Sequence, residues 1–437
     1  MSDITLEPIR KPFLAQFTPP GSKSLTNRAM VLAAMAEGTS TLSNCLFADD
    51  TLVMIDSLRR LGYGVEADPG SRRIAIRGRK GCVPACEAEL FCGNSGTSIR
   101  FLTALCGLGS GRYLLDGIAR MRQRPIGQLV DMLRNLGMRV EYEQAPGFPP
   151  VRVLGSRGLP GGIVQFGNAQ SSQYLSAVLM VCPYARHEVK VDLVGELTSW
   201  PYVEMTMRLM GEFGAWVEVM KDPKTSVPKQ IIVLRDPYGA TDYAVEPDAS
   251  NASYFMAAAA LHEGSKVLIQ GLGRGSLQGD VKFAEVLGRM GAAVKCRDQC
   301  IEVEGTGELG GIDLDLRDMP DMAQTLAVTA VFADGPTTIR GLHTLRVKET
   351  DRIAALASEL RKLGAGVEVE GDDLTIEPPD RARPAAIDTY DDHRMAMSFA
   401  LAGTKVAGVT IRDAECVNKT YPGYFEDLRR VTSFLAG

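Results

Sequence analysis

The chain has 437 residues, of which 45% are hydrophobic and 23% are charged, and its formal net charge is −5. This composition excludes a disordered, collagen-like or coiled-coil chain and favours two or three globular domains. The acidic balance argues weakly against nucleic acid as a partner, but it leaves small anionic ligands open because these depend on local clusters of cations.

The chain shows no sequence signal for a membrane or for export. No apolar run approaches the 18 residues of a membrane span, and residues 1–12 resemble neither a signal peptide nor a transit peptide. The nine cysteines form no C-x-x-C pair, which is typical of reduced thiols. We therefore expect a cytoplasmic protein that does not bind a membrane.

A helix–strand pattern repeats along the chain. Five helix-like segments end on a glycine and continue as a β-like segment, and these glycines are Gly62, Gly137, Gly214, Gly291 and Gly364, spaced by 75, 77, 77 and 73 residues. Glycine suits the end of a helix, where a positive φ is needed before the next strand. A further step of 73 residues from Gly364 reaches Gly437, after the similar helix YFEDLRRVTSFLAG, and an Ala/Leu-rich helix precedes each of the six segments, from RAMVLAAMAEG to RMAMSFALAG. The pattern predicts six units, each helix–strand–helix–strands.

Six such units predict an α/β protein with two lobes of three units each. The Ala/Leu-rich helices are apolar almost all round, so we expect them inside the lobes with the sheets outside. We expect the N-terminal lobe over residues 22–245 and a discontinuous C-terminal lobe over residues 1–21 plus 246–437, because residues 1–21 are strand-like. A cleft between the lobes is then the expected place for a ligand.

Nucleotide and metal motifs are weak in this sequence. PPGSKS (19–24) fails as a phosphate loop because Ser22 separates Gly21 from Lys23, and GLGRGS (271–276) lacks the final glycine of G-x-G-x-x-G. Four histidines without H-E-x-x-H argue against zinc. The pairs Asp49-Asp50 and Asp391-Asp392 could bind magnesium, although capping of helix N-termini is the interpretation we favour.

Several cationic segments do not recur between the units. They are GSKSLTNR (21–28), GNSGTSIR (93–100), MRQRP (121–125), LRVKETDR (345–352), DDHRM (391–395) and NKTYPG (418–423). Structural residues of a repeat should recur, so these segments indicate a shared functional site. The first two open helices, where backbone N–H groups favour anions. Glu349 lies inside a basic cluster, which is how a proton-transfer group is placed beside an anionic substrate.

In order along the chain, these segments resemble the motif series of the 5-enolpyruvylshikimate-3-phosphate (EPSP) synthase family. Further segments that match are SSQYLSAVLM, LTSWPYVEMT, VEPDASNASYF and MPDMAQTLAV, and the resemblance covers nearly the whole chain. It implies a two-lobed inverted α/β barrel with three repeats per lobe. It also implies transfer of the enolpyruvyl group of phosphoenolpyruvate to the 5-hydroxyl of shikimate 3-phosphate with release of phosphate.

The resemblance places this reaction in the shikimate pathway to chorismate and aromatic amino acids, as the target of glyphosate. It implies no metal, no organic cofactor and no partner besides the two substrates, and we expect a monomer. Two alternatives stay open: the enolpyruvyl transferase acting on UDP-N-acetylglucosamine, whose Lys-Asn start and loop cysteine are missing here, and a repeat scaffold without catalysis.

The resemblance also assigns residues. It places shikimate 3-phosphate on Lys23, Ser24, Arg28, Ser171, Ser172, Gln173, Ser199, Tyr202, Asp321 and Lys348. It places phosphoenolpyruvate on Lys23, Gly96, Arg124, Gln173, Arg352, Arg394 and Lys419. The implied catalytic residues are Asp321 as the base for the 5-hydroxyl, Glu349 as the proton donor to the methylene carbon, and Lys23, which touches both substrates.

Three positions depart from the family's pattern. Thr344 stands where many members have an Asn that contacts the shikimate phosphate. Ser95 replaces a frequent Ala, and Phe101 replaces a frequent Pro. The phosphate contact and the conformation of the loop at Gly96 therefore stay open.

Overall fold

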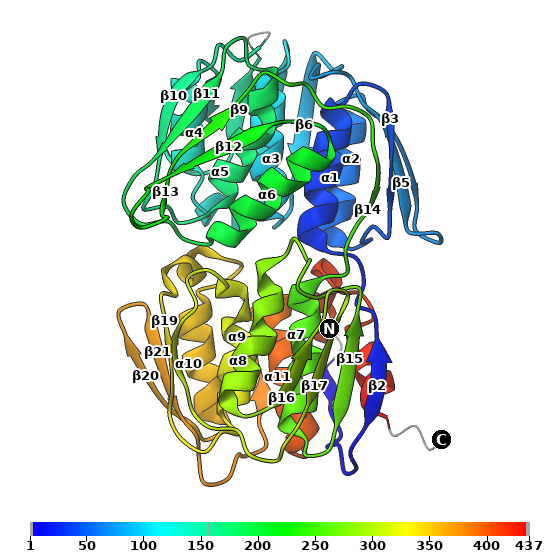
Figure 1. The fold of residues 1–437 in the computed structure, drawn as a ribbon, viewed down its shortest axis with the longest axis vertical. Helices are drawn as coiled ribbons and strands as arrows, with labels where there is room; N and C mark the ends of the chain where they lie inside the picture. The colour runs from blue at the N-terminus through cyan, green and yellow to red at the C-terminus, as the bar shows by residue number, and fades with distance from the viewer. Residues whose placement is uncertain (1–2, 156–157, 434–437) are drawn as a thin grey trace. The chain divides into compact units, whose positions relative to one another are not determined.

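The chain folds into two compact units. The computed structural model describes residues 3–155 and 158–433. We call residues Gly21–Val245 the N-terminal unit, and the chain up to Pro20 together with the chain from Glu246 onward the C-terminal unit. Within the described residues, the strands form six sheets, five with four strands and one with three (Figure 1).

The second repeat shows the architecture of one sheet. Its elements are β6 (Glu87–Phe91), α3 (Gly96–Gly107), β7 (Arg112–Asp116), α4 (Gly127–Asn135), β8 (Arg139–Tyr142) and β9 (Val151–Leu154). The strands β6 and β7 are parallel and are joined through α3, whereas β9 pairs antiparallel with both β7 and β8. The sheet order is therefore β6-β7-β9-β8.

The third and fifth repeats have the same order. The third consists of β10 (Gly162–Phe166), α5 (Gln173–Val181), β11 (Val189–Leu193), α6 (Trp200–Glu212), β12 (Val217–Lys221) and β13 (Pro228–Val233). The fifth consists of β18 (Asp313–Asp315), α9 (Ala323–Ala330), β19 (Thr337–Arg340), α10 (Arg352–Lys362), β20 (Gly366–Glu370) and β21 (Asp373–Glu377).

The first and fourth repeats take their first strand from a distant part of the chain. The first consists of α1 (Lys23–Met35), β3 (Thr39–Ser43), α2 (Asp49–Arg60), β4 (Gly64–Asp68) and β5 (Arg73–Arg77), with β14 (Asp242–Ala244) parallel to β3. The fourth consists of α7 (Ala249–Leu261), β15 (Lys266–Gln270), α8 (Phe283–Met290), β16 (Ala293–Cys296) and β17 (Cys300–Glu304), with β2 (Leu14–Phe17) parallel to β15. Since β2 precedes α1 and β14 precedes α7, each connection between the units leaves a strand in one unit and begins a helix of the other.

The sixth repeat also uses the start of the chain. It consists of β22 (Ala386–Ile387), α11 (His393–Lys405), β23 (Thr410–Ile411) and α12 (Tyr424–Thr432). The strand β1 (Ile4–Thr5) pairs antiparallel with β23 and completes the three-stranded sheet. The predicted α/β fold class, with six helix–strand repeats in two lobes of three, is confirmed.

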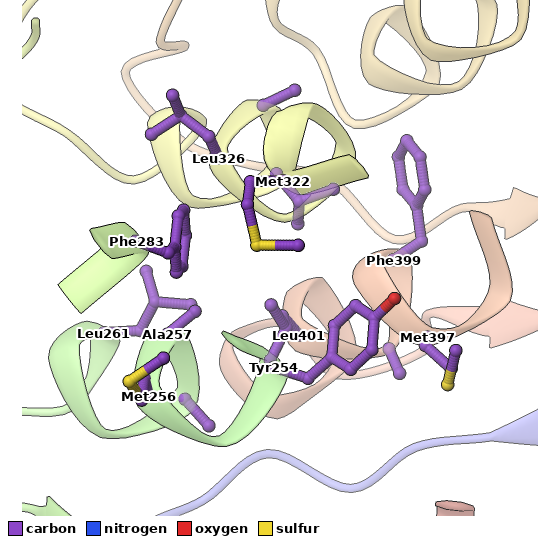
Figure 2. Packing of buried hydrophobic residues seen from close by; sticks show 14 of the residues in the cluster. Tyr254, Met256, Ala257, Leu261, Phe283, Met322, Leu326, Met397, Phe399 and Leu401 are labelled. Atoms are coloured by element: carbon purple, nitrogen blue, oxygen red, sulfur yellow. The ribbon is translucent and has the colours of Figure 1, made fainter. Parts of the chain in front are cut away.

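The Ala/Leu-rich helices form the interior of each unit. In the C-terminal unit α7, α9 and α11 pack against one another, and every residue of α7 and α9 is buried. Figure 2 shows Leu261 of α7, Met322 directly before α9 and Leu401 of α11 lying between these helices. Burial of one such side chain stabilises the fold by about 1.5–3 kcal/mol.

Within residues 3–155 and 158–433, no helix is both long and apolar enough to cross a membrane.

The recurring glycines end the second helix of five repeats. Their φ angles are positive: 86° at Gly62, 90° at Gly137, 93° at Gly214, 122° at Gly291 and 98° at Gly364. Each turns the chain from a helix into the next strand, so these five predicted helix ends are confirmed, whereas Gly437 lies outside the described residues. A side chain is rarely stable in this left-handed conformation, which explains why glycine recurs there.

Two glycines near the end of α6 separate backbone strain from packing. A Cβ at Gly211 or at Gly214 would meet nothing within 4 Å, but only Gly214 has a positive φ. We expect Gly214→Ala to lower the free energy of unfolding by about 1–2 kcal/mol. Gly211→Ala should raise it by about 0.5 kcal/mol, because alanine favours the helix. Urea denaturation of both variants measures the two shifts, and shifts of equal sign would contradict this interpretation.

Candidate active site

The predicted site residues fall into two groups, one in each unit. Those in the N-terminal unit are Lys23, Ser24, Arg28, Gly96, Arg124, Ser171, Ser172, Gln173, Ser199 and Tyr202. Those in the C-terminal unit are Asp321, Lys348, Glu349, Arg352, Arg394 and Lys419. Each group is described by itself.

In the N-terminal unit, three predicted residues begin central helices. Lys23 begins α1, Gly96 begins α3 and Gln173 begins α5. The starts of α3 and α5 are adjacent, because the Gln173 side-chain amide donates to the Thr97 hydroxyl over 3.2 Å. The first N–H groups of a helix have no partner within the helix and carry partial positive charge, so paired helix starts can bind an anion.

Arg28 is buried among neutral groups. Its Nε donates to the Thr206 hydroxyl over 2.7 Å and its Nη1 to the Ser24 carbonyl over 3.0 Å, and the Phe101 ring centroid lies 5.1 Å from its guanidinium carbon. Within the described residues, no carboxylate lies within ion-pair distance of this guanidinium, although the residue is only 1% exposed. Burial, partly opposed by Tyr202, lowers the pKa of Arg28. A buried cation with neutral neighbours is suited to bind an anionic ligand.

Arg100 is a site residue that the sequence did not identify. Its Nη1 donates to the Gln173 side chain over 2.7 Å and to the Ser171 hydroxyl over 3.3 Å, while its guanidinium lies over the Tyr174 ring. Arg100 is therefore in contact with two predicted phosphate-binding residues. The sequence signal that could have identified Arg100 is its spacing of four residues from Gly96, which places both residues on one face of α3.

Gly96 lies directly beside Arg124. A Cβ at Gly96 would lie 2.5 Å from Nη2 of Arg124 and 2.9 Å from its guanidinium carbon. The same guanidinium donates through Nη1 to the carbonyl of Asn94 over 2.8 Å and to its side-chain oxygen over 3.1 Å. The absence of a side chain at Gly96 therefore leaves room for the Arg124 cation at the start of α3.

The other predicted residues of this unit lie at helix starts. Lys23 forms a 3.2 Å ion pair with Asp50 in the first turn of α2. Ser172 precedes α5, and Ser199 precedes α6 in a left-handed conformation with φ 57°. The Tyr202 N–H donates to the Ser199 carbonyl over 3.1 Å. The N-cap residue of α2 is Ala48, which forms no side-chain cap hydrogen bond, so the capping expected of Asp49-Asp50 is wrong. Asp50 instead lies in the first turn and pairs with Lys23.

In the C-terminal unit, a buried guanidinium is shared by three carboxylates. The Arg352 side chain is 2% exposed, and it lies 2.7 Å from Asp392, 2.9 Å from Glu349 and 3.2 Å from Asp321. Burial alone lowers the pKa of Arg352, but the charges of Asp392, Glu349 and Asp321 raise it above its usual value. Breaking such a buried pair would leave an uncompensated charge, so this cluster is held in one arrangement.

Asp321 connects the predicted cations of this unit. It follows Pro320, which begins a short 3-10 helix before α9, and its carboxylate lies 3.4 Å from Lys348, 3.2 Å from Arg352 and 3.0 Å from Arg394. Arg394 also donates to the Tyr254 hydroxyl over 3.4 Å. One carboxylate therefore contacts three cations that come from two segments of the chain, residues 345–352 and 391–395.

Glu349 and Lys419 complete the cluster. Glu349 is largely buried, and its second carboxylate oxygen lies 4.0 Å from Lys419 Nζ. All six predicted residues of this unit are thereby joined through direct contacts. The sequence did not place Asp392 in the site, since Asp391-Asp392 was weighed there as a magnesium-binding pair and a helix cap was favoured. Asp392 does cap α11 by accepting from the Arg394 N–H over 2.9 Å, but it also holds Arg352.

Thr344 is one of the positions that depart from the family's pattern. Its side chain is buried, and in the sequence it lies four residues before Lys348 of this cluster. It lies in a 3-10 helix (His343–Val347) directly before Lys348, and its hydroxyl has no hydrogen-bond partner among the described residues.

Across residues 3–155 and 158–433, no group of three or more His, Cys, Asp or Glu side chains could hold a metal ion. The arrangement can bind anions on both units, and in the C-terminal unit it can also transfer protons through carboxylates.

Comparisons with known proteins agree with this chemistry. Residues 9–428 match the family model described as EPSP synthase (3-phosphoshikimate 1-carboxyvinyltransferase). The chloroplastic 3-phosphoshikimate 1-carboxyvinyltransferase of Arabidopsis thaliana is 47% identical over 99% of this chain and 85% of its own length. The enzyme of that name from Sulfurovum sp. (strain NBC37-1) is 46% identical over 99% of this chain and its full length. A solved EPSP synthase from Acinetobacter baumannii superposes with a TM-score of 0.79 at 28% identity, covering 98% of both chains.

The buried Arg352–Asp392 pair should contribute far more to stability than an exposed pair of the same geometry. We expect Asp392→Asn to lower the free energy of unfolding by about 3 kcal/mol, because asparagine can still cap α11 but leaves Arg352 undercompensated. The control is Asp313→Asn, which breaks the bidentate pair that Arg340 forms with Asp313 at 2.8 and 2.7 Å on the surface of the same unit. Urea denaturation should show almost no shift for this control; equal shifts would contradict the role of burial.

Proposed function

Because the chain belongs to the EPSP synthase family and is a 3-phosphoshikimate 1-carboxyvinyltransferase of the shikimate pathway, we propose that residues of its two units have different roles in the reaction. The reaction transfers the enolpyruvyl group of phosphoenolpyruvate to shikimate 3-phosphate and releases phosphate. The identity of 46–47% with enzymes of this activity, over 99% of the chain, favours it over the two alternatives that the sequence left open, the transferase acting on UDP-N-acetylglucosamine and a scaffold without catalysis.

One observation carries the proposal: the buried cations of the two units are paired differently. In the N-terminal unit, Arg28 contacts only neutral groups among the described residues. In the C-terminal unit, Arg352 and Arg394 contact the carboxylate of Asp321. A phosphate that does not react needs cations without competing anions, whereas a reacting hydroxyl and methylene carbon need carboxylates that exchange protons.

We assign the phosphate and ring of shikimate 3-phosphate to the residues that the resemblance named. They are Lys23, Ser24, Arg28, Ser171, Ser172, Gln173, Ser199, Tyr202, Asp321 and Lys348. Serine hydroxyls and amide groups at the start of α5 supply neutral donors, and Arg28 supplies charge-assisted ones. Arg100 supports this group by holding Ser171 and Gln173. The buried, unpartnered Thr344 hydroxyl supports a contact with the same phosphate in place of the family's Asn.

We assign phosphoenolpyruvate to residues at the ends of helices in both units. They are Lys23, Gly96, Arg124, Gln173, Arg352, Arg394 and Lys419. This substrate carries a carboxylate and a phosphate, and both are anionic. One negative and one positive unit charge 4 Å apart attract each other by about 4 kcal/mol at an effective dielectric near 20. Several convergent cations are therefore needed before two anionic substrates can bind together.

Asp321 and Glu349 have the two proton-transfer roles. Asp321 accepts the proton of the 5-hydroxyl, whose oxygen then bonds to the enol carbon of phosphoenolpyruvate. Glu349 donates a proton to the methylene carbon, so that the added electron pair is taken up as a C–H bond. The intermediate then loses phosphate and a proton from the new methyl group, which restores the double bond. Lys348 contacts the substrate hydroxyl and keeps it near Asp321.

Substrate binding should make Asp321 a better base. In the free protein its carboxylate is shared by Lys348, Arg352 and Arg394, and opposite charges at this distance disfavour proton uptake. The anion of phosphoenolpyruvate competes for Arg352 and Arg394, so part of the stabilisation of the Asp321 carboxylate is withdrawn when the substrate binds. The base is then most basic in the complex that reacts.

We also propose that the protein acts as a cytoplasmic monomer with lobes over residues 22–245 and over residues 1–21 plus 246–437. The nine cysteines are all free thiols, which fits a reducing compartment. All assigned site residues lie on one chain, so the proposed chemistry needs no second copy.

Asp321→Asn tests the assignment of the base. The substitution keeps the shape of the side chain but removes its proton acceptor, so turnover should fall by about 10²–10⁴-fold. The measurement is release of phosphate that requires both substrates, together with titration of shikimate 3-phosphate, whose affinity should stay within about tenfold. Asp313→Asn, an exposed acidic residue paired with an arginine, is the control and should keep normal turnover. Normal turnover of Asp321→Asn would move the base elsewhere.

Gly96→Ala tests whether this glycine acts through Arg124. The new Cβ would lie too close to the Arg124 guanidinium, which must move, and overpacking of this kind costs about 1–3 kcal/mol. We expect the KM for phosphoenolpyruvate to rise about tenfold, with a smaller effect on shikimate 3-phosphate. The double variant Gly96→Ala/Arg124→Ala should then be no worse than Arg124→Ala alone. Multiplying effects would show that Gly96 acts independently of Arg124.

A further inference from the structure

Thr206 lies where three helices of the N-terminal unit meet, and no role has been assigned to it. It is fully buried on α6, and its hydroxyl accepts a 2.7 Å hydrogen bond from Nε of Arg28 on α1. The same hydroxyl lies 2.8 Å from the Tyr202 carbonyl, to which it donates, and 2.9 Å from the hydroxyl of Ser176 on α5. One side chain therefore connects the buried cation with the two helices beside it.

The hydrogen bonds of Arg28 leave part of its guanidinium available. A guanidinium has five N–H groups. Nε uses its hydrogen on Thr206, Nη1 uses one on the Ser24 carbonyl, and Nη2 uses one on Ser176 over 3.4 Å. One N–H on each terminal nitrogen has no acceptor among the described residues. Terminal guanidinium N–H groups can donate to two oxygens of one phosphate or one carboxylate.

The contacts around Arg28 fix the plane of this pair. The shortest hydrogen bond is that to Thr206, and the Phe101 ring lies against the guanidinium at 5.1 Å. The contact to Ser176 is long, so it restrains rotation weakly. If the Thr206 oxygen were removed, Nε would be left buried without an acceptor. The guanidinium would then rotate to regain one, and its terminal N–H groups would change direction.

We propose that Thr206 is a positioning residue for shikimate 3-phosphate, which holds the Arg28 guanidinium in the orientation that binds an anionic group of this substrate, its phosphate or its carboxylate. The inference rests on the proposed role of Arg28. Because Arg28 is assigned to this substrate alone, loss of the Thr206 hydroxyl should weaken shikimate 3-phosphate and should have little effect on phosphoenolpyruvate.

Thr103 provides a matched control in the same unit. It is also a fully buried threonine on a helix, and its hydroxyl donates to the carbonyl four residues earlier, that of Ile99, over 2.6 Å. Thr206 makes the corresponding bond to Tyr202, four residues before it. The two residues differ in that only Thr206 accepts a hydrogen bond from Arg28. A general cost of replacing a buried hydroxyl by a methyl group should appear in both.

The experiment compares Thr206→Val, Thr206→Ser and Thr103→Val by the KM of each substrate and by kcat. We expect Thr206→Val to raise the KM for shikimate 3-phosphate by about tenfold or more, since hydrogen bonds to charged groups are strong. The KM for phosphoenolpyruvate and kcat should change less than about threefold. Thr206→Ser should restore most of the loss, and Thr103→Val should leave both KM values unchanged.

Several outcomes would overturn the inference. They are an unchanged KM for shikimate 3-phosphate in Thr206→Val, an equal loss for both substrates, or the same loss in Thr103→Val. Thr206→Ala and Thr103→Ala repeat the comparison if a valine variant fails to fold. Arg28→Lys, measured in parallel, separates the two levels of argument: if it leaves the KM for shikimate 3-phosphate unchanged, the proposed role of Arg28 is wrong. If it raises that KM while Thr206→Val does not, only the positioning role is wrong.

Discussion

Buried guanidinium groups impose the main constraint on this protein: Arg28 lies on the interior helix α1, and Arg352 begins α10. A buried cation has lost its contacts with water, so its charge must be compensated by particular groups of the protein. Arg28 is compensated by hydroxyls, a carbonyl and an aromatic ring, whereas Arg352 is compensated by three carboxylates. The choice between neutral and acidic partners determines what each unit can do with an anionic substrate.

Neutral and acidic partners have opposite consequences for binding. A ligand phosphate that reaches Arg28 displaces no charge, so its full electrostatic attraction contributes to affinity. An anion that reaches Arg352 or Arg394 must compete with Asp321, which reduces affinity but changes the environment of the carboxylate. In the proposed reaction, part of the binding free energy is thus exchanged for a weaker hold of these cations on the Asp321 carboxylate, which is useful only where a proton moves.

The sequence predicted the parts of the fold that depend on local chemistry. The spacing of glycines such as Gly62 and Gly291 predicted the repeat and the helix ends, because a positive φ is a local requirement. The all-apolar helices predicted the interior. The pairing of β2 with β15 and of β14 with β3 joins segments more than 190 residues apart, and periodicity alone does not specify which strand completes which sheet.

The site was predictable only where residue type and motif pointed to chemistry. Asp321, Arg352 and Arg394 were expected as ligand-binding residues, but their mutual contacts depend on segments 31 and 73 residues apart, which only folding brings together. Asp392 was visible in the sequence as a helix cap, and nothing local indicated that it would also hold Arg352. Arg100 and Thr206 were missed for the same reason: each acts on a predicted residue of another helix, so their roles follow from packing. The spacing of Arg100 from Gly96 is visible in the sequence, but its partners Ser171 and Gln173 are not, because the packing of the helices brings them together.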